Sequence, residues 1–183
     1  MEQPKNNSDS GDGPRTPEGH ASTTMTEFAK ETDRTFLAAY IEKTRALYQA
    51  HGLSDENFTY VSGKSVEIVY TPSAGQEGHE GITHGGIVAF MIDASAGAFA
   101  MTVAKPEEVA VTRGTDITYN QPVLTGKPVY VRSAISPDKN EGTKRQVFIR
   151  TEVIQDDSVV VSAETECMIA RPEVLARIQA TQE

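Results

Sequence analysis

The residues most able to carry out chemistry lie in one glycine-rich segment that begins at Gly81 and ends at Asp93. In this segment His84 is followed directly by Gly85 and Gly86. A glycine loop that runs into a helix exposes unpaired backbone N–H groups, and the positive end of the helix dipole adds to their attraction for negative charge. Such groups could bind the oxyanion that forms on a carbonyl under attack, and glycine lets a ligand approach the backbone. A tight loop before any helix could have the same composition.

Asp93 is the second candidate, because it stands among apolar residues on a helix that we expect to be buried. Carboxylates are seldom buried without a partner, and a partly desolvated carboxylate is suited to act as a general base. The alternative is a carboxylate that is simply paired with a backbone group or with a hydroxyl such as that of Ser95.

The spacing of His84 and Asp93 carries a prediction about assembly. They are nine positions apart, which puts them on opposite faces of a helix and roughly 13 Å apart along its axis. If both serve one site, Asp93 must come from a second copy of the protein. The segment therefore predicts a dimer with two composite sites.

The hydrophobic pattern predicts the elements that position these residues. Residues 87–104 are apolar on nearly every side, which is typical of a buried helix. Apolar residues at spacings of three and four predict an amphipathic helix from Asp33 toward Gly52. Alternating or β-branched runs predict strands over 58–61, 66–70, 109–119, 129–136, 144–155 and 159–170. The last segment, 172–183, is predicted to form a short helix.

Short turns between the last four strands favour an antiparallel meander. The predicted fold class is α+β: an antiparallel sheet wrapped around one long buried central helix, with an extra N-terminal helix. Residues 1–30 are rich in Ser, Gly, Pro, Asn and Asp and are predicted to be a disordered polar tail. Residues 31–183 form the single predicted domain.

Composition excludes several classes of protein. The 183 residues carry a net charge of -9, from 26 acidic and 17 basic residues. This charge argues against a nucleic-acid-binding protein and against a protein that binds membranes through a polybasic surface. The single cysteine, Cys167, excludes an intramolecular disulfide. No apolar run reaches the ~20 residues of a membrane span, and the first residues lack a signal-like apolar core. We therefore expect a cytoplasmic protein. We also expect no metal site, because the spacing of His79, Glu80 and His84 fits no metal-binding pattern.

The glycine-rich segment resembles the motif of the hotdog-fold acyl-CoA thioesterases. The shared pattern is His-Gly-Gly, six further residues and Asp, with a glycine three positions before the histidine. The segment from Ile117 to Pro122 resembles the strand that follows the catalytic helix, and the likeness runs from roughly Tyr60 to Ala170, closest to the branch of phenylacetic-acid-pathway thioesterases. It implies a hotdog fold, hydrolysis of acyl-CoA without a separate cofactor, and a homodimer or dimer of dimers built by edge-to-edge pairing of sheets.

The resemblance also implies roles for single residues. Asp93 matches the general base or nucleophile, Gly85 the residue whose N–H polarises the thioester carbonyl, and His84 the histidine that shapes the loop. Thr112 matches a position whose hydroxyl orients water or the carboxylate, although an ordinary strand threonine is the alternative. Several members carry Asn six residues before the motif histidine, where this chain has Gly78.

Coenzyme A carries phosphates, so cations should lie near the mouth of the site. The candidates for contact with it are Gly86, Arg113, Lys144 and Arg145, with Lys139 close in sequence. A solvated hairpin is the alternative reading of these cations. The acyl tunnel is predicted to be lined by large apolar side chains, namely Phe58, Phe90, Met91, Phe99 and Met101.

Two other functions stay open. The same fold could bind acyl-thioesters without hydrolysing them. It could also be a hydratase or dehydratase, but that chemistry normally needs a histidine beside the acid, and the predicted buried helix contains none.

Overall fold

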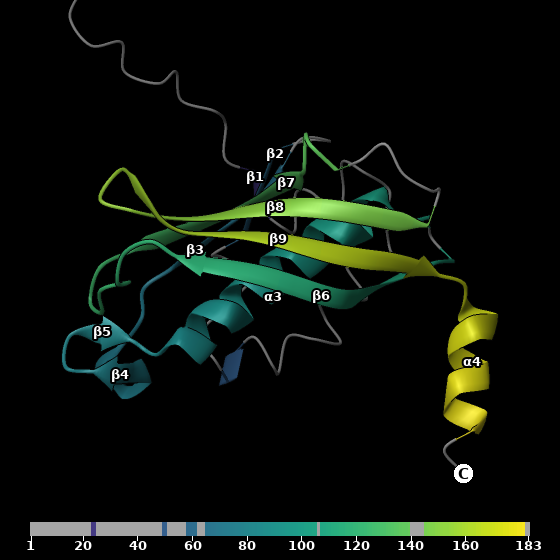
Figure 1. The fold of residues 1–183 in the computed structure, drawn as a ribbon, viewed down its shortest axis with the longest axis horizontal. Coiled ribbons are helices and arrows are strands. Elements are labelled where there is room, and N and C mark those ends of the chain that lie inside the picture. The colour runs from purple at the N-terminus through teal and green to yellow at the C-terminus, as the bar shows by residue number, and fades with distance from the viewer. Residues whose placement is uncertain are drawn as a thin grey trace, which may run out of the picture.

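The computed structural model describes residues 23–24, 49–50, 58–61, 65–105, 107–139 and 145–181. One antiparallel sheet of seven strands, in the order β1-β2-β3-β7-β8-β9-β6, curves around one long helix, α3 (Gly85–Val103) (Figure 1). The strands are β1 (Thr23–Thr24), β2 (Phe58–Val61), β3 (Ser65–Tyr70), β6 (Val109–Tyr119), β7 (Val129–Ile135), β8 (Gln146–Gln155) and β9 (Ser158–Ala170). This confirms the predicted α+β hotdog architecture, with strand bounds within two residues of those expected.

Two predictions fall mostly outside the described residues. Of the helix predicted from Asp33, only positions 49–50 are described, and they are helical. Of the polar tail predicted over residues 1–30, only Thr23–Thr24 are described, and they pair with β2. The Lys144 position also lies outside the described part of the chain.

The place of β6 in the sheet differs from the predicted meander. Strands β7, β8 and β9 do follow one another as hairpins, but β6 pairs with β9 and not with β7. The connection from Tyr119 to Val129 is too long for a tight turn. It contains Pro122 and Pro128, and it turns at Gly126, whose φ is +74°. It therefore carries the chain across to β3, which becomes the neighbour of β7.

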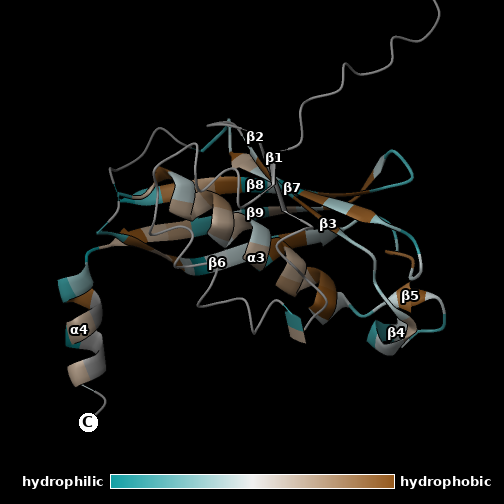
Figure 2. Ribbon diagram, turned by 180° about the vertical axis from the view of Figure 1, so that it is seen from behind, coloured by the Kyte–Doolittle hydropathy of each residue, from teal (hydrophilic) through white to brown (hydrophobic). Residues whose placement is uncertain are grey.

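The core forms between α3 and the concave face of the sheet (Figure 2). Side chains of β3, β8 and β9 alternate between buried and half-buried over most of each strand, and those of β7 mostly between buried and exposed, as the two-residue period of a strand requires. Among the largest fully buried side chains, α3 contributes Val88, Met91, Ile92 and Phe99. By length and composition α3 is apolar enough to cross a membrane, but most of it is buried against the sheet, as a core helix would be.

None of the described residues fully covers one face of α3, here called the uncovered face, which corrects the prediction of a helix buried on every side. Gly86 and Asp93 are exposed, and Phe90 and Gly97 are half-buried. These positions recur at spacings of three and four, so they share one side of the helix.

A chain of buried hydroxyls ties the opposite side of α3 to the sheet. The Ser95 hydroxyl donates to the Val131 carbonyl at 3.3 Å, and Ser133 donates to Ser95 Oγ at 2.8 Å. Ser133 and Thr151 are joined in turn at 2.8 Å. Buried hydroxyls need such partners, and these partners fix the rotation of the helix about its axis.

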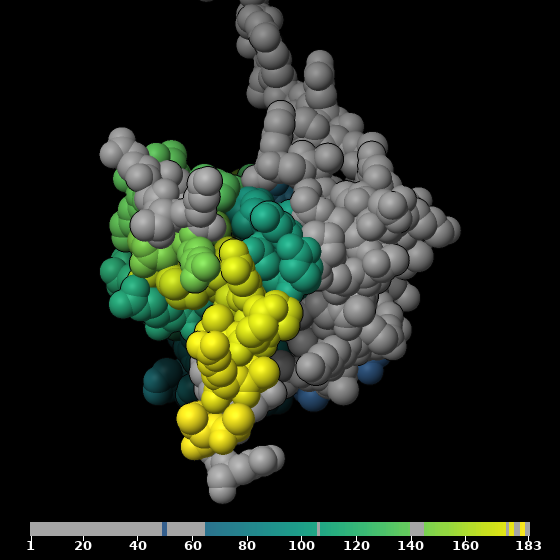
Figure 3. Space-filling view, turned by 90° about the vertical axis from the view of Figure 1, so that its right-hand side faces the viewer, coloured from purple at the N-terminus to yellow at the C-terminus, as the bar shows by residue number. Residues whose placement is uncertain are grey.

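A short hairpin precedes α3 where the sequence predicted only a loop. After a 3₁₀ turn (Ala74–Gln76), strands β4 (Glu77–His79) and β5 (Ile82–Thr83) pair around Gly81, whose φ of +72° favours glycine. At the other end of the domain, helix α4 (Pro172–Ala180) follows β9. Figure 3 shows α4 in yellow on the surface of that end.

Candidate active site

The first turn of α3 presents a free backbone donor. His84 caps the helix, because the Gly86 N–H donates to His84 Nδ1 at 3.0 Å. The next two N–H groups, of Ile87 and Val88, donate to the His84 carbonyl at 2.9 and 3.2 Å. Among the described residues, none accepts a hydrogen bond from the Gly85 N–H. This N–H is therefore available to a ligand at the positive end of the helix.

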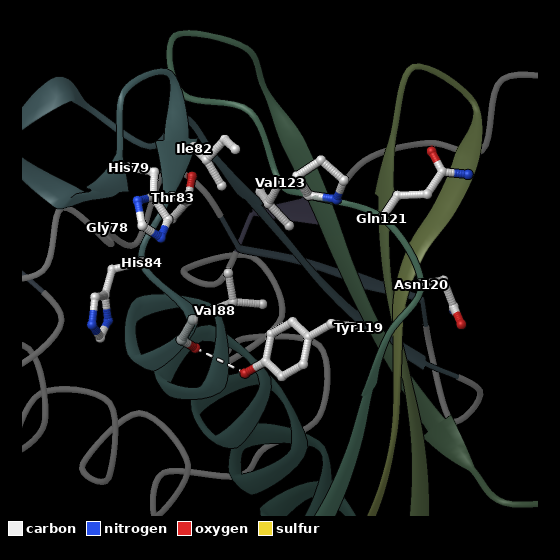
Figure 4. A pocket seen from close by; sticks show the side chains of 12 residues that line it. Gly78, His79, Ile82, Thr83, His84, Val88, Tyr119, Asn120, Gln121 and Val123 are labelled. Atoms are coloured by element: carbon white, nitrogen blue, oxygen red, sulfur yellow. Dashed lines mark hydrogen bonds between the residues drawn. The ribbon is translucent and has the colours of Figure 1, made fainter.

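A cavity of about 560 Å³ opens beside that donor. It lies between the start of α3, the β4–β5 hairpin and the segment after β6. In Figure 4, Val88, Val123 and Tyr119 surround it, and the His84 ring points away from it. Ile82 adds to its apolar lining. The cavity is thus mainly apolar, with Gly85 at its wall and polar residues such as His79, Asn120 and Gln121 also in its lining.

The large side chains predicted to line an acyl tunnel are placed elsewhere. Met91, Phe99 and Met101 are 2% exposed or less and belong to the core. Phe90 is half-buried against that core, and the Phe58 side chain lies outside the described part. For Met91, Phe99 and Met101 the prediction is wrong, because size and apolarity do not tell which side of a buried helix faces a cavity. For Phe58 and Phe90 it stays a prediction.

Asp93 is exposed, which corrects its predicted burial. Thr112 on β6 donates its hydroxyl hydrogen to Asp93 Oδ1 at 2.8 Å, so the carboxylate has a hydroxyl partner. That partner is not Ser95, whose hydroxyl points the other way into the core. The carboxylate therefore lies on the uncovered face of α3, fixed in direction by the neighbouring strand.

The two chemical features do not meet within one chain. Gly85 and Asp93 are eight positions apart, which corresponds to roughly 12 Å along a helix. Asp93 is absent from the lining of the cavity beside Gly85. Gly85 and Asp93 thus lie at separate places on one chain.

Comparisons with known proteins identify the domain. Residues 80–162 match the family model of the thioesterase superfamily. The domain has the hotdog fold, and its central part is similar to the thioesterase superfamily. No curated protein matches the sequence.

Solved hotdog structures share this fold at low identity. A thioesterase family protein from Silicibacter pomeroyi is 13% identical, with a TM-score of 0.63 over 75% of this chain and 97% of its own. The PaaI protein from the phenylacetic acid degradation operon of E. coli is 13% identical, with a TM-score of 0.61 over 74% and 94%. The smu.793 protein from Streptococcus mutans UA159, bound to acetyl CoA, is 14% identical, with a TM-score of 0.55 over 63% and 88%.

Gly78 departs from the asparagine found in several hotdog thioesterases, and the structure gives a reason. A Cβ at position 78 would lie 3.2 Å from both the Cα and Cδ2 of His84. Part of that contact is backbone, so a side chain would displace the loop. Here the histidine ring takes the space beside residue 78.

The predicted cations lie away from the cavity, toward the other end of β6. Arg113 is 61% exposed in its side chain, and its Nη1 donates to Glu166 at 2.8 Å. That hydrogen bond lowers the pKa of the Glu166 carboxyl. Arg145 is exposed at the start of β8. Neither arginine lines the cavity beside Gly85, whereas both lie near the end of the sheet from which α4 leaves.

Tyr119 is the residue at this site that sequence reasoning did not single out. Its hydroxyl donates to the Gly85 carbonyl at 2.9 Å, across the wall of the cavity. The signal available was an aromatic residue at an exposed strand end before Asn-Gln-Pro, which does not reveal the bond to Gly85.

Neither a reactive thiol nor a metal cluster adds to this site in the described part of the chain. Cys167 is buried beside Thr112, and burial raises the pKa of its thiol to about 11, so it stays protonated and unreactive. In the parts of the chain that are described, no group of three or more His, Cys, Asp or Glu side chains could hold a metal ion.

Proposed function

We propose that this protein hydrolyses acyl-CoA thioesters to a free acid and coenzyme A, at a site that two copies of the chain share. The observation that carries the proposal is the unoccupied Gly85 N–H beside an apolar cavity. The match of residues 80–162 to the thioesterase superfamily supports thioester hydrolysis as the general chemistry. The acetyl CoA bound to the Streptococcus relative supports coenzyme A as the thiol.

The proposed chemistry uses Gly85 and Asp93 in one step. The Gly85 N–H donates to the carbonyl oxygen of the thioester and stabilises the oxyanion as it develops. The Asp93 carboxylate takes a proton from water as the water oxygen bonds to the carbonyl carbon. The carbon–sulfur bond then breaks, and coenzyme A leaves as a thiolate that gains a proton. Direct attack by the Asp93 carboxylate, through a mixed anhydride, is the other route.

Two copies are proposed because one chain cannot bring its own Gly85 and Asp93 together. β6 ends the sheet, and among the described strands none pairs with its outer edge. A long unpaired edge is a ready template for another strand. An antiparallel match between two β6 strands reverses their ends, so the Gly85 end of one copy approaches the Asp93 and Thr112 region of the other.

The same arrangement gives the arginines a proposed role. In the paired assembly, Arg113 and Arg145 of one copy lie at the end approached by the other copy's cavity. Arginine suits phosphate oxygens because of its planar set of donors. The proposed reaction needs no cofactor, since coenzyme A is part of the substrate.

The test is a panel of acyl-CoAs of different chain length and aromatic character, assayed by release of free thiol. Wild type and Asp93→Ala are run together, with Asp116→Ala as a control carboxylate on the same exposed region of β6. We expect thiol release by wild type and Asp116→Ala, and a kcat at least ~10²-fold lower in Asp93→Ala, as for loss of a general base.

The outcomes separate the alternatives. Binding of an acyl-CoA without thiol release from any panel member would favour the non-catalytic binding module. Hydration of an unsaturated acyl-CoA without hydrolysis would favour the hydratase. Near-normal turnover by a folded Asp93→Ala would remove Asp93 from the mechanism.

A further inference from the structure

The peptide group between Gly85 and Gly86 is held at both of its polar ends. Its N–H, on Gly86, donates to His84 Nδ1 at 3.0 Å. Its carbonyl, on Gly85, accepts from the Tyr119 hydroxyl at 2.9 Å. The two partners come from different elements, since His84 caps α3 and Tyr119 ends β6. Figure 4 shows the Tyr119 ring reaching across to the helix.

Such a clamp has a physical purpose at this position. Two successive glycines open α3, and glycine loses more backbone freedom in a helix than any other residue. They also lack side chains that could pack and hold the turn. The Gly85 N–H belongs to the preceding peptide, whose carbonyl on His84 accepts from Ile87 and Val88. The Tyr119 bond holds the peptide on the other side of the Gly85 Cα, so the two peptides together set the direction of the Gly85 N–H.

The environment of Tyr119 suits a permanent donor. A Cβ built on Gly85 would lie 3.6 Å from the Tyr119 hydroxyl oxygen and 3.7 Å from Cζ, so the ring packs directly against this glycine. Burial raises the pKa of the Tyr119 hydroxyl above its ordinary value. The hydroxyl therefore keeps its proton, and keeps donating, through the neutral and moderately alkaline range.

We propose that Tyr119 is a positioning residue: its hydrogen bond to the Gly85 carbonyl holds the peptide after Gly85 in place, and thereby limits rotation at Gly85 that would turn its own N–H away from the substrate. Its catalytic consequence rests on the proposed thioesterase function. The clamp itself is a property of the folded chain. Tyr119 does not take or give a proton in the reaction; it holds the oxyanion donor still.

The first test measures the clamp without substrate. Amide hydrogen exchange of Gly85 and Gly86 is followed by NMR in the full chain for wild type, Tyr119→Phe and Tyr130→Phe. Tyr130 is the matched control, because it is 42% exposed against 50% for Tyr119 but lies on β7 away from the cavity. We expect exchange of the Gly86 amide at least about fivefold faster in Tyr119→Phe alone, from loss of one hydrogen bond.

The second test measures the consequence for turnover on the best acyl-CoA of the panel. We expect kcat to fall roughly three- to tenfold in Tyr119→Phe with KM within about twofold of wild type, because the ring and the cavity wall remain. A role in stability alone would lower the thermal midpoint and leave kcat unchanged.

The two readouts decide the proposal separately from the function. Exchange at Gly86, or kcat, that matches the Tyr130→Phe control would overturn it. If wild type hydrolyses no acyl-CoA, the proposed function fails, while the exchange rates still show whether Tyr119 holds the peptide.

Discussion

The carboxylate of Asp93 is exposed on the single chain, yet it has one defined direction. The Thr112 hydroxyl donates to one of its oxygens at 2.8 Å and leaves the other oxygen free. A hydrogen bond to a charged acceptor contributes more than a neutral one, about 1.5–3 kcal/mol. Thr112 therefore restricts the rotamers of a side chain that would otherwise move freely in water.

A pair of substitutions at Thr112 tests this orienting role. Thr112→Val keeps the β-branched shape but removes the donor, so we expect kcat to fall roughly tenfold or more. Thr112→Ser keeps the hydroxyl and should stay within about threefold of wild type. Steady-state kinetics on one acyl-CoA measures both. Equal activity of the two variants would mean that the hydroxyl is an ordinary strand feature.

Gly85→Ala should lower the activity without lowering the stability of the fold. The added Cβ would meet its nearest neighbour, the Tyr119 hydroxyl, at 3.6 Å, which is ordinary contact. Alanine is also a better helix former than glycine, by about 1 kcal/mol in a helix interior. We expect unchanged or higher stability in denaturant but a kcat/KM reduced at least ~10-fold, because the methyl group obstructs approach to the N–H. A fully active variant would show that no ligand needs that space.

At the scale of elements, the rotation of α3 decides where Asp93 points. Ser95 is two positions from Asp93, which is about 200° around the helix. Its buried hydroxyl is fixed to Val131 and Ser133 on β7. With that side anchored to the sheet, Asp93 is directed toward β6 and the uncovered face.

Removal of this anchor should be measurable as stability. Ser95→Ala breaks the link to Val131 and leaves Ser133 with Thr151 as its hydroxyl partner. We expect a loss of about 1–3 kcal/mol in the free energy of unfolding, measured by urea denaturation. Ser162→Ala, at a half-buried position on β9, serves as the control and should change it by less than about 0.5 kcal/mol. Equal losses in both variants would deny Ser95 a special role.

The sequence predicted the elements well and their contacts only in part. Alternation from Val147 to Val153 and the apolar run after Gly86 identified β8 and α3, because periodicity is a local property. The pairing of β6 with β9 was not predicted, because local sequence patterns do not show when a strand pairs with one other than the next strand in the chain. The exposure of Asp93 was also mispredicted, because the sequence does not show that one face of a nearly uniformly apolar helix stays uncovered. The Tyr119–Gly85 bond joins positions far apart in sequence, and it required the fold.

At the scale of the whole molecule, the uncovered face of α3 and the edge strand β6 are joined by the Asp93–Thr112 bond. Apolar side chains such as Val103 and Val111 are also exposed, at 45% and 44%. Exposed apolar side chains beside an unpaired strand are typical of an interaction surface. A second copy placed there would complete the proposed site.

Mixing two inactive variants tests the shared site directly. Asp93→Asn and Gly85→Ala are co-refolded in equal amounts, and thiol release is compared with that of each variant alone. In a mixed dimer one site holds both defects and the other holds none. Random pairing therefore predicts recovery of about a quarter of wild-type activity. No recovery, despite mixed dimers detected by native mass spectrometry, would place Gly85 and Asp93 of one site in the same chain.

The pairing of β6 with β9 also has a consequence for how the chain folds. Val109 pairs with Ala170 and Tyr119 with Val161, so β6 is synthesised long before the strand that holds it. Contacts that are distant in sequence must close a large loop first, which slows folding. Until β9 arrives, both edges of β6 lack a strand partner from the described part of the chain. We therefore expect β6 to be most open to aggregation before β9 is made, and pairing with β9 then covers one of its two edges.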